Sequence, residues 1–208
     1  PRTWLARVAS TGRNATLKIV GNMGRNFVYV DNSNVFIEGS RLSAVARGLP
    51  GAGTLVEAMN NHVVDHNWML DYGALHQFAC GDPSEIGAAH LWGSPPPGDS
   101  FWAMVERFGF EVVKYDRSVA GKEKKVDVAI AHRITKDAYS GRVRKGIDEI
   151  TLVSGDKDFV PVVEDLVADG FTVDVVFWNH GAAELKAAAT RFVNLDPHLD
   201  TLTKKWRP

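Results

Sequence analysis

An acidic pair follows an apolar run in the segment from Thr151 to Leu166, which reads TLVSGDKDFVPVVEDL. The run ends on Ser154 and Gly155, and the carboxylates of Asp156 and Asp158 then follow with one residue between them. Two like charges this close repel each other unless a cation or a hydrogen-bond network lies between them. The pattern therefore indicates a divalent metal site at the end of a buried strand.

Two further acids are expected at the same edge of the fold. Asp31 ends the β-rich run of residues 27–30, and Asp127 opens a helix that leads into the strand before Asp156. In a parallel sheet, ligands bind beyond the carboxyl ends of the strands. We therefore expect these acids, which are distant in sequence, to converge in space.

A cluster of carboxylates suits a hard cation, Mg²⁺ or Mn²⁺, better than zinc, which prefers His and Cys. Such an ion lowers the pKa of a bound water and neutralises a phosphoryl oxygen, which is the chemistry of phosphodiester hydrolysis. Asn34 would orient a carboxylate or a water through its side-chain amide, or else would cap the helix that follows Asp31. Structural roles also exist for Asp158, as the N-cap of a helix beginning at Phe159, and for Asp127, as a first-turn acid that complements the helix dipole.

The elements that must position these residues alternate along the chain. Strands are predicted at residues 27–30, 75–80, 110–115, 150–153 and 171–178, and helices at residues 35–47, 55–63, 101–108, 126–139, 159–168 and 182–190. The segment from Gly81 to Ser100 contains four glycines and four prolines and is predicted to be a long loop. This alternation predicts an α/β fold with a mainly parallel sheet of about five to six strands, covered on both faces.

The composition is that of a globular protein, with 208 residues, 45% hydrophobic residues and a net charge of -1. Basic residues are concentrated in the first 26 residues and between Arg117 and Lys145, which fits a polyanionic partner or a solvated face. Cys80 is the single cysteine, so an internal disulfide and a cysteine metal cluster are excluded. No apolar run reaches the about 18 residues of a membrane span. We expect a cytoplasmic protein without a membrane partner.

Three segments resemble the NYN domain, a branch of the PIN-like ribonuclease superfamily that includes the LabA-like bacterial proteins. They are VYVDNSN at residues 28–34, KKVDVAIA at residues 124–131 and LVSGDKDFVPVVEDLVADGFTVDVV at residues 152–176. The resemblance covers residues 27–196, which leaves a basic N-terminal arm at residues 1–26 and a polar C-terminal tail at residues 197–208. It implies a Rossmann-like three-layer α/β/α sandwich and a ribonuclease that uses Mg²⁺ or Mn²⁺ to cleave RNA. The implied metal-binding and catalytic acids are Asp31, Asp127, Asp156 and Asp158, with Asn34 as their polar companion.

One position departs from the family pattern. Many relatives carry another acid six positions after the aspartate of the lysine-valine-aspartate segment, where this chain has Arg133, preceded by His132. An arginine there would repel a second cation, which favours a one-metal or weakened site. Alternatively, Arg133 would bind a phosphate of the substrate or pair with an acid.

Basic side chains around the acids would hold the phosphate backbone of RNA. The predicted nucleic-acid-binding residues are Arg117, Lys122, Lys124, Lys125 and Arg133. The aromatic residues Trp92, Phe101 and Trp102 would stack on bases or, as we favour, fill the core.

Other functions fit the sequence less well. The chain has no G-x-x-x-x-G-K-[ST] segment of an NTPase and no G-x-S-x-G segment of a serine hydrolase. An aspartyl-phosphate phosphatase needs its acidic pair after the first strand, whereas here the pair comes late. The main alternative is a non-catalytic RNA-binding or regulatory protein on the same fold. The sequence leaves open a homo-oligomer formed through apolar residues of the N-terminal arm.

Overall fold

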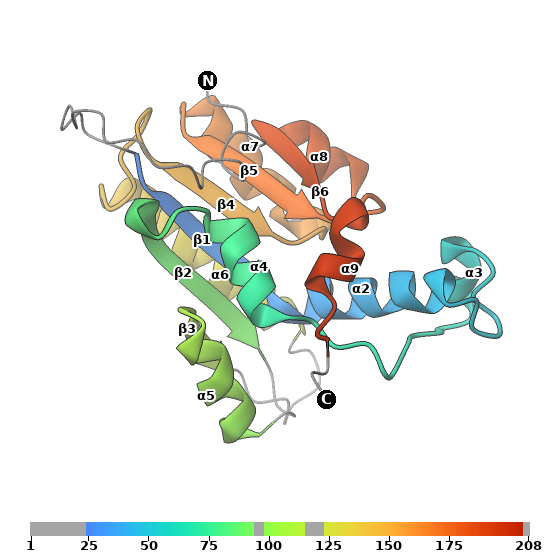
Figure 1. The fold of residues 1–208 in the computed structure, drawn as a ribbon. Coiled ribbons are helices and arrows are strands. Elements are labelled where there is room, and N and C mark those ends of the chain that lie inside the picture. Colours follow the sequence, from blue (N-terminus) through green and yellow to red (C-terminus); the bar gives the residue numbers. More distant parts are fainter. Residues whose placement is uncertain (1–23, 94–97, 115–122, 206–208) are drawn as a thin grey trace, which may run out of the picture.

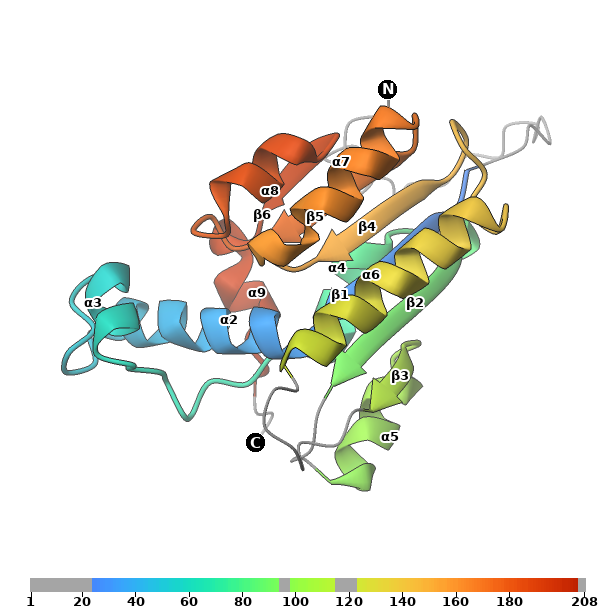
Figure 2. The same cartoon turned by 180° about the vertical axis from the view of Figure 1, so that it is seen from behind.

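The computed structural model describes residues 24–93, 98–114 and 123–205, and residues 123–125 by their backbone alone. The chain forms a three-layer α/β/α sandwich (Figures 1 and 2). One parallel six-stranded sheet has the order β3-β2-β1-β4-β5-β6. The strands are β1 (Asn26–Asp31), β2 (Ile86–Gly93), β3 (Glu111–Lys114), β4 (Glu149–Val153), β5 (Thr172–Phe177) and β6 (Arg191–Asn194). The α/β fold class predicted from the sequence is confirmed.

Helices cover both faces of the sheet. The α-helices are α2 (Asn32–Ala46), α3 (Leu55–Asn60), α4 (Tyr72–Cys80), α5 (Asp99–Arg107), α6 (Glu123–Tyr139), α7 (Val160–Ala168), α8 (Ala183–Ala188) and α9 (Leu199–Leu202). Short 3-10 turns occur at η1 (Pro83–Glu85), η2 (Lys157–Phe159) and η3 (Asp196–His198). Helices α4, α5 and α9 lie on one face of the sheet, and α6, α7 and α8 lie on the other (Figures 1 and 2). Helix α2 leads away from the carboxyl end of β1 and carries α3 at its far end.

The central strand β1 is buried along its whole length because both of its faces are covered. Val28 and Val30 pack into the core shared with α4 and α5, whereas Phe27 and Tyr29 pack into the core shared with α6 and α7. This alternation follows from the two-residue period of a strand. It places the next residue, Asp31, on the side of the sheet that α6 covers.

The prediction for residues 75–100 was wrong. The segment from Leu75 to Cys80, predicted as a strand, belongs to helix α4, which begins where the carboxylate of Asp71 accepts the N–H of Ala74 at 2.9 Å. Strand β2 instead lies inside the segment predicted as a long loop. Its small residues are needed for packing, because a Cβ on Gly87 would lie 2.6 Å from the ring of Phe27.

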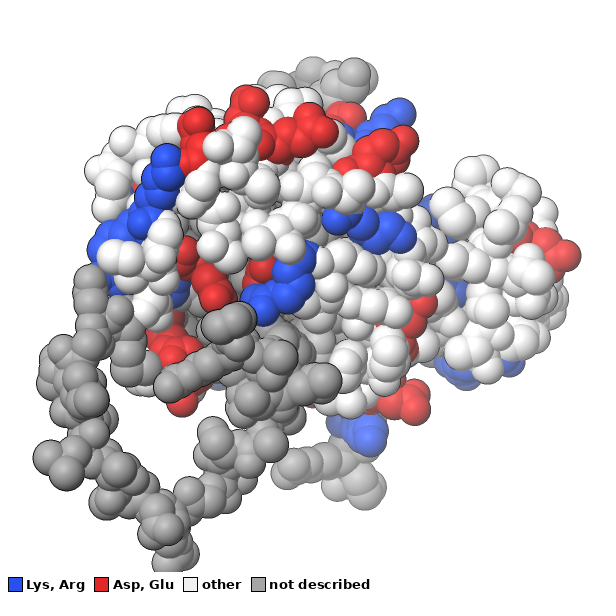
Figure 3. All heavy atoms as spheres, turned by 90° about the horizontal axis from the view of Figure 1, so that it is seen from above, with Lys and Arg blue, Asp and Glu red and all other residues white. Residues whose placement is uncertain are grey.

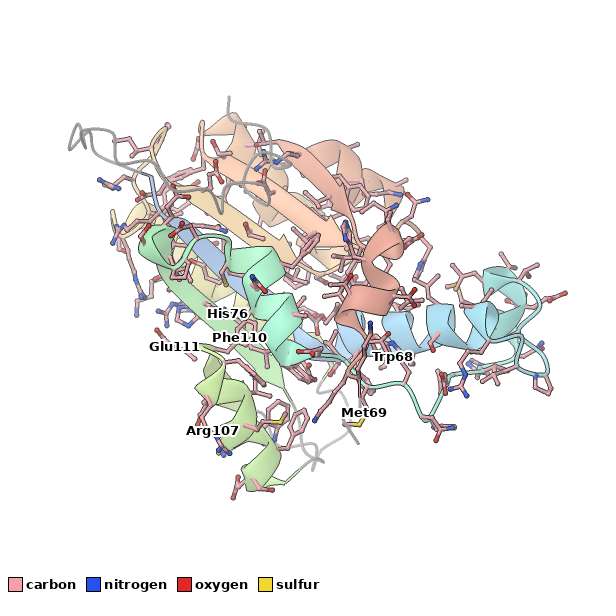
Figure 4. All side chains as sticks on the ribbon, in the orientation of Figure 1. Trp68, Met69, His76, Arg107, Phe110 and Glu111 are labelled. Atoms are coloured by element: carbon pink, nitrogen blue, oxygen red, sulfur yellow. The ribbon has the colours of Figure 1, made fainter. Side chains whose placement is uncertain are left out.

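Residues beyond the predicted domain boundary at residue 196 also pack on the sandwich. Leu202 of α9 is fully buried, and the backbone N–H of Lys204 donates to the carbonyl of Met69 at 2.8 Å. Figure 4 shows Trp68 and Met69 beside α2 and α9. The folded unit therefore extends into the segment predicted to be a polar tail.

In Figure 4, His76 of α4 and Phe110, just before β3, lie close together, with their ring centroids 4.9 Å apart. This contact ties α4 to the edge of the sheet. No helix among the described residues has the length and apolar character needed to span a bilayer.

Candidate acidic site at the carboxyl edge of the sheet

The order in which the chain adds strands to the sheet reverses between β1 and β4. Strand β1 lies between β2, the next strand along the chain, and β4, from which the chain continues to β5 and β6 on the other side. A crevice forms at such a switch point, beyond the carboxyl ends of the strands, and ligands of α/β proteins bind there. Asp31 ends β1, and the segment with Asp156 and Asp158 follows β4, so the predicted acids come to this switch point.

Asp31 is both a helix cap and a buried acid. Asp31 is only 5% exposed. Its Oδ1 accepts the backbone N–H of Asn34 at 3.2 Å, and this hydrogen bond caps α2. Burial is the main cause that raises the pKa of Asp31 to about 7; the charges of Asp127 and Asp156 act in the same direction, and the backbone hydrogen bonds from Asn34 and Ser33 oppose them. The carboxylates of Asp127 on α6 and of Asp156 after β4 are therefore each close enough to Asp31 to disfavour its charged form.

Helix α6 brings Asp127 to this edge. Val126, Ile130 and Ile134 form its buried stripe against the sheet, as predicted, and Asp127 is half-buried beside that stripe. Figure 2 shows the first turns of α6 next to the end of β1 and the start of α2. The position of Asp127 thus follows from the apolar stripe of its own helix.

Asp156 and Asp158 differ in their surroundings. Asp156 is half-buried, and its Oδ1 accepts the backbone N–H of Asp158 at 2.9 Å, so Asp156 caps the 3-10 turn η2. The alternative role of Asp158 as N-cap of the next helix does not occur, since α7 begins at Val160 without a side-chain cap. Asp158 is exposed, so of the four predicted acids it lies furthest toward solvent.

Asn34 connects the end of β1 to the loop after β4. Its Oδ1 accepts the backbone N–H of Gly155 at 2.8 Å and the hydroxyl of Ser154 at 3.2 Å. The cap of α2 is Asp31, so the capping role considered for Asn34 does not occur. Asn34 instead holds the loop that carries Asp156.

Arg133 pairs with an acid on its own helix. Its Nε donates to Oδ2 of Asp137 at 2.8 Å, and the same carboxylate accepts the hydroxyl of Tyr29 at 3.0 Å. Of the roles considered for Arg133, the structure shows the pairing with an acid. The side chain of Arg133 is 32% exposed. His132 is exposed on α6.

The other predicted nucleic-acid-binding residues fall outside the described side chains. Arg117 and Lys122 lie in a segment that is not described, and for Lys124 and Lys125 only the backbone, in α6, is described. Figure 3 shows one face of the molecule, on which Lys and Arg form separate groups with Asp and Glu between them. On that face, the described residues do not form a continuous basic band.

The aromatic residues near the second strand belong to the core. Trp92 is 3% exposed and Trp102 is 1% exposed, and Phe101 is half-buried. The rings of Trp92 and Tyr29 stack with their centroids 6.2 Å apart. This agrees with the core interpretation that the sequence favoured over base stacking.

Sequence reasoning missed two residues at this edge. Glu38 of α2 and His180, which follows β5, are hydrogen-bonded to each other at 2.8 Å. Their positions carried a usable signal, because Glu38 lies one helical turn after Asn34 and His180 follows a predicted strand.

The donor chemistry of the acidic site fits a hard cation. Asp31, Asp127 and Asp156 offer only oxygen atoms, and an ion between them would relieve the repulsion that raises the pKa of Asp31. Within residues 24–93, 98–114 and 123–205, no group of three or more His, Cys, Asp or Glu side chains lies in an arrangement that would hold an ion by itself. Mg²⁺ commonly keeps several waters and binds through one or two carboxylates, so these residues still fit such an ion.

Comparison with known proteins identifies the family. The model of the NYN domain matches residues 27–196. Among solved structures, the chain is similar to a protein of unknown function, VPA0982, from Vibrio parahaemolyticus RIMD 2210633, with a TM-score of 0.61 and 20% identity over 88% of this chain and 98% of that chain. That likeness shows a shared fold, and a comparison with curated proteins gives no match. With its parallel sheet, its acidic switch point and a family match over most of its length, the chain belongs to the NYN domain family of the PIN-like superfamily.

Proposed function

We propose that the protein is a Mg²⁺- or Mn²⁺-dependent ribonuclease that hydrolyses RNA phosphodiester bonds at the carboxyl edge of its sheet. The observation that supports this most is the position of the buried Asp31 at the end of β1, at the switch point where Asp156 follows β4; the charges of Asp127 and Asp156 help to raise its pKa. Membership of a nuclease-like family supports the same class of reaction.

The four acids would divide the work according to their burial. Asp31 is fixed by its role in the α2 cap and would form the rigid floor of the ion site. Asp127 and Asp156 are half-buried and would complete it, while the exposed Asp158 would act at the entrance. A bound ion supplies an activated water and neutralises charge on the phosphoryl group. Asn34 would keep Asp156 in place through Gly155.

The substrate would be held by its phosphates. We assign backbone contacts to Arg117, Lys122, Lys124 and Lys125, which precede Asp127 in the sequence. Arg133 would contribute through the part of its guanidinium group that Asp137 does not occupy, since its side chain is 32% exposed.

A second candidate function is RNA binding without cleavage. Arg133 favours it, because this residue occupies a position where the family pattern expects an acid and its charge would weaken a two-ion site. On that account, RNA affinity depends on salt but not on divalent ions or on the acids.

An RNA degradation assay separates the two functions. We expect single-stranded or structured RNA to be cleaved by the wild type with added Mn²⁺, and both Asp31→Asn and Asp156→Asn to reduce cleavage to the background seen with chelator. Asp165→Asn is the matched control, because Asp165 is an exposed aspartate on α7. Cleavage that persists in both acidic-site variants, or in excess chelator, would contradict the proposal. RNA binding without any cleavage would support the regulatory function instead.

A further inference from the structure

A second polar cluster lies at the carboxyl edge of the sheet. His180, in the loop of residues 178–182 after β5, bonds through Nε2 to Oε2 of Glu38 on α2 at 2.8 Å, and Arg41 pairs with the same carboxylate. The side chains of Glu38, His180 and Arg41 are 14%, 15% and 19% exposed. The cluster is therefore largely shielded from water.

Helix α2 contacts two neighbouring loops through successive turns. Asn34 binds Gly155 in the loop after β4, and Glu38, four residues later, binds His180 in the loop after β5. Residues at this spacing lie on the same face of a helix, with Cβ atoms about 5–6 Å apart. Trp178 adds a third contact, because its Nε1 donates to the carbonyl of Val35 at 2.9 Å.

The two loops also bind each other. The backbone N–H of Ala182 donates to the carbonyl of Gly155 at 3.0 Å. The approach is close, since a Cβ on Gly181 would lie 3.2 Å from Cα of Gly155. Helix α2, the loop after β4 and the loop after β5 therefore form a closed set of contacts around the residue that precedes Asp156.

The bond between Glu38 and His180 is the side chain to side chain link between the loop of residues 178–182 and α2, beside the bond from Trp178 to the backbone of Val35. Burial alone would raise the pKa of Glu38, but the hydrogen bond from His180 and the charge of Arg41 outweigh it and lower that pKa. The carboxylate is then ionised and can only accept, so Nε2 of His180 carries the proton. Hydrogen bonds to a charged, shielded group are stronger than neutral ones.

We propose that Glu38 and His180 are positioning residues for the acidic site: their bond holds the loop of residues 178–182 against Gly155, and so fixes Asp156 relative to Asp31. The assignment of a role in catalysis rests on the proposed nuclease function, whereas the mechanical coupling of the two loops does not. Partners that orient metal ligands from outside typically contribute roughly 10-fold to 100-fold in affinity or activity.

The test follows amide hydrogen exchange in the loops together with Mn²⁺ affinity. In His180→Ala, we expect faster exchange at the amides of Gly155 and Ala182 and unchanged exchange in the core of β1. Mn²⁺ affinity should fall by roughly 10-fold to 100-fold. The kcat for RNA should fall with it, with little change in KM. His180→Gln, which can still donate to Glu38, should restore most of the loss. If His180→Ala does not fold, Glu38→Gln should show faster exchange at the amides of Gly155 and Ala182.

His66→Ala is the matched control, because His66 is an exposed histidine in a different loop. Unchanged exchange at Gly155 and Ala182 in His180→Ala, or equally faster exchange throughout the protein, would overturn the proposal. If the loop amides respond while the wild type neither binds Mn²⁺ nor cleaves RNA, the coupling of the loops is supported and the nuclease function is not.

Discussion

Asp31 has two roles that conflict when no cation is present. As the cap of α2 it stabilises the helix, but as a buried carboxylate near Asp127 and Asp156 it is destabilised in its charged form. An asparagine caps a helix as well as an aspartate does and carries no charge. The two roles can therefore be separated by one substitution.

We expect Asp31→Asn to stabilise the protein in the absence of divalent ions at about pH 8. The folded-state pKa of about 7 exceeds the ordinary 3.8, so the folded state binds more protons between these values, and stability is lost as the pH rises through this window. The melting temperature of the variant should exceed that of the wild type by roughly 2–4 °C for each kcal/mol of relief. The gain should shrink toward about pH 4.

Thermal unfolding in chelator across this pH range checks the prediction. Asp165→Asn should unfold like the wild type at every pH. A variant at Asp31 that melts below the wild type at high pH would show that the carboxylate is not strained by its neighbours.

The acidic positions themselves were predictable because each follows a strand or lies near the start of a helix with a clear apolar stripe. Their unequal burial was not, since it depends on the loop after β4, whose contacts with Asn34 and Ala182 come from distant segments. The link between Glu38 and His180 joins residues 142 positions apart and was missed for the same reason.

At the scale of elements, strands rich in β-branched residues were predicted well, whereas strand β2, which contains several small residues, was not. Strand β4 was predicted over residues 150–153 and spans Glu149–Val153. Strand β2 reads IGAAHLWG, and in a parallel sheet buried on both faces it shows no polar alternation. Helix α4 was mistaken for a strand because its apolar residues are dense and its N-cap, Asp71, lies four residues before the predicted segment of residues 75–80.

We expect Gly155→Ala to disturb the element that carries Asp156. A Cβ at this position would lie 2.1 Å from Cδ1 and Cε1 of Phe177, which is buried at the end of β5. The loop or the ring must therefore shift, at a cost of about 1–3 kcal/mol. Urea unfolding should show this loss, and a Mn²⁺ titration should show weaker binding.

Gly98→Ala is the control for that substitution, because a Cβ there meets nothing within 4 Å. It should lower stability by no more than about 1 kcal/mol, because alanine is a poorer N-cap residue than glycine. Equal Mn²⁺ affinity in wild type and Gly155→Ala would argue against a precise loop position.

At the scale of the whole molecule, the net charge of -1 gives no general attraction to RNA, so the RNA binding that we propose would depend on local groups of basic residues. The start of α6 is the strongest candidate, because Lys124 and Lys125 precede the acidic site in the same helix. A lysine side chain near the acids would hold a phosphate of the RNA beside them.

We expect Lys125→Ala to weaken RNA binding in chelator and to reduce the dependence of log K on log salt by roughly 0.7, the contribution of one phosphate contact on a single strand. Lys136→Ala is the control, since Lys136 is exposed near the other end of the same helix. Fluorescence anisotropy at several salt concentrations measures both. Equal slopes for the two variants would place the RNA elsewhere.

The central claim is that one divalent ion binds among Asp31, Asp127 and Asp156, held by one or two of these carboxylates and by waters that the others orient. The most direct measurement is a Mn²⁺ titration followed by electron paramagnetic resonance. We predict one class of bound Mn²⁺ in the wild type and in Asp165→Asn, and its loss in each of Asp31→Asn, Asp127→Asn and Asp156→Asn. Mn²⁺ bound with the same affinity by all of these variants, or by none of the proteins including the wild type, would contradict the account.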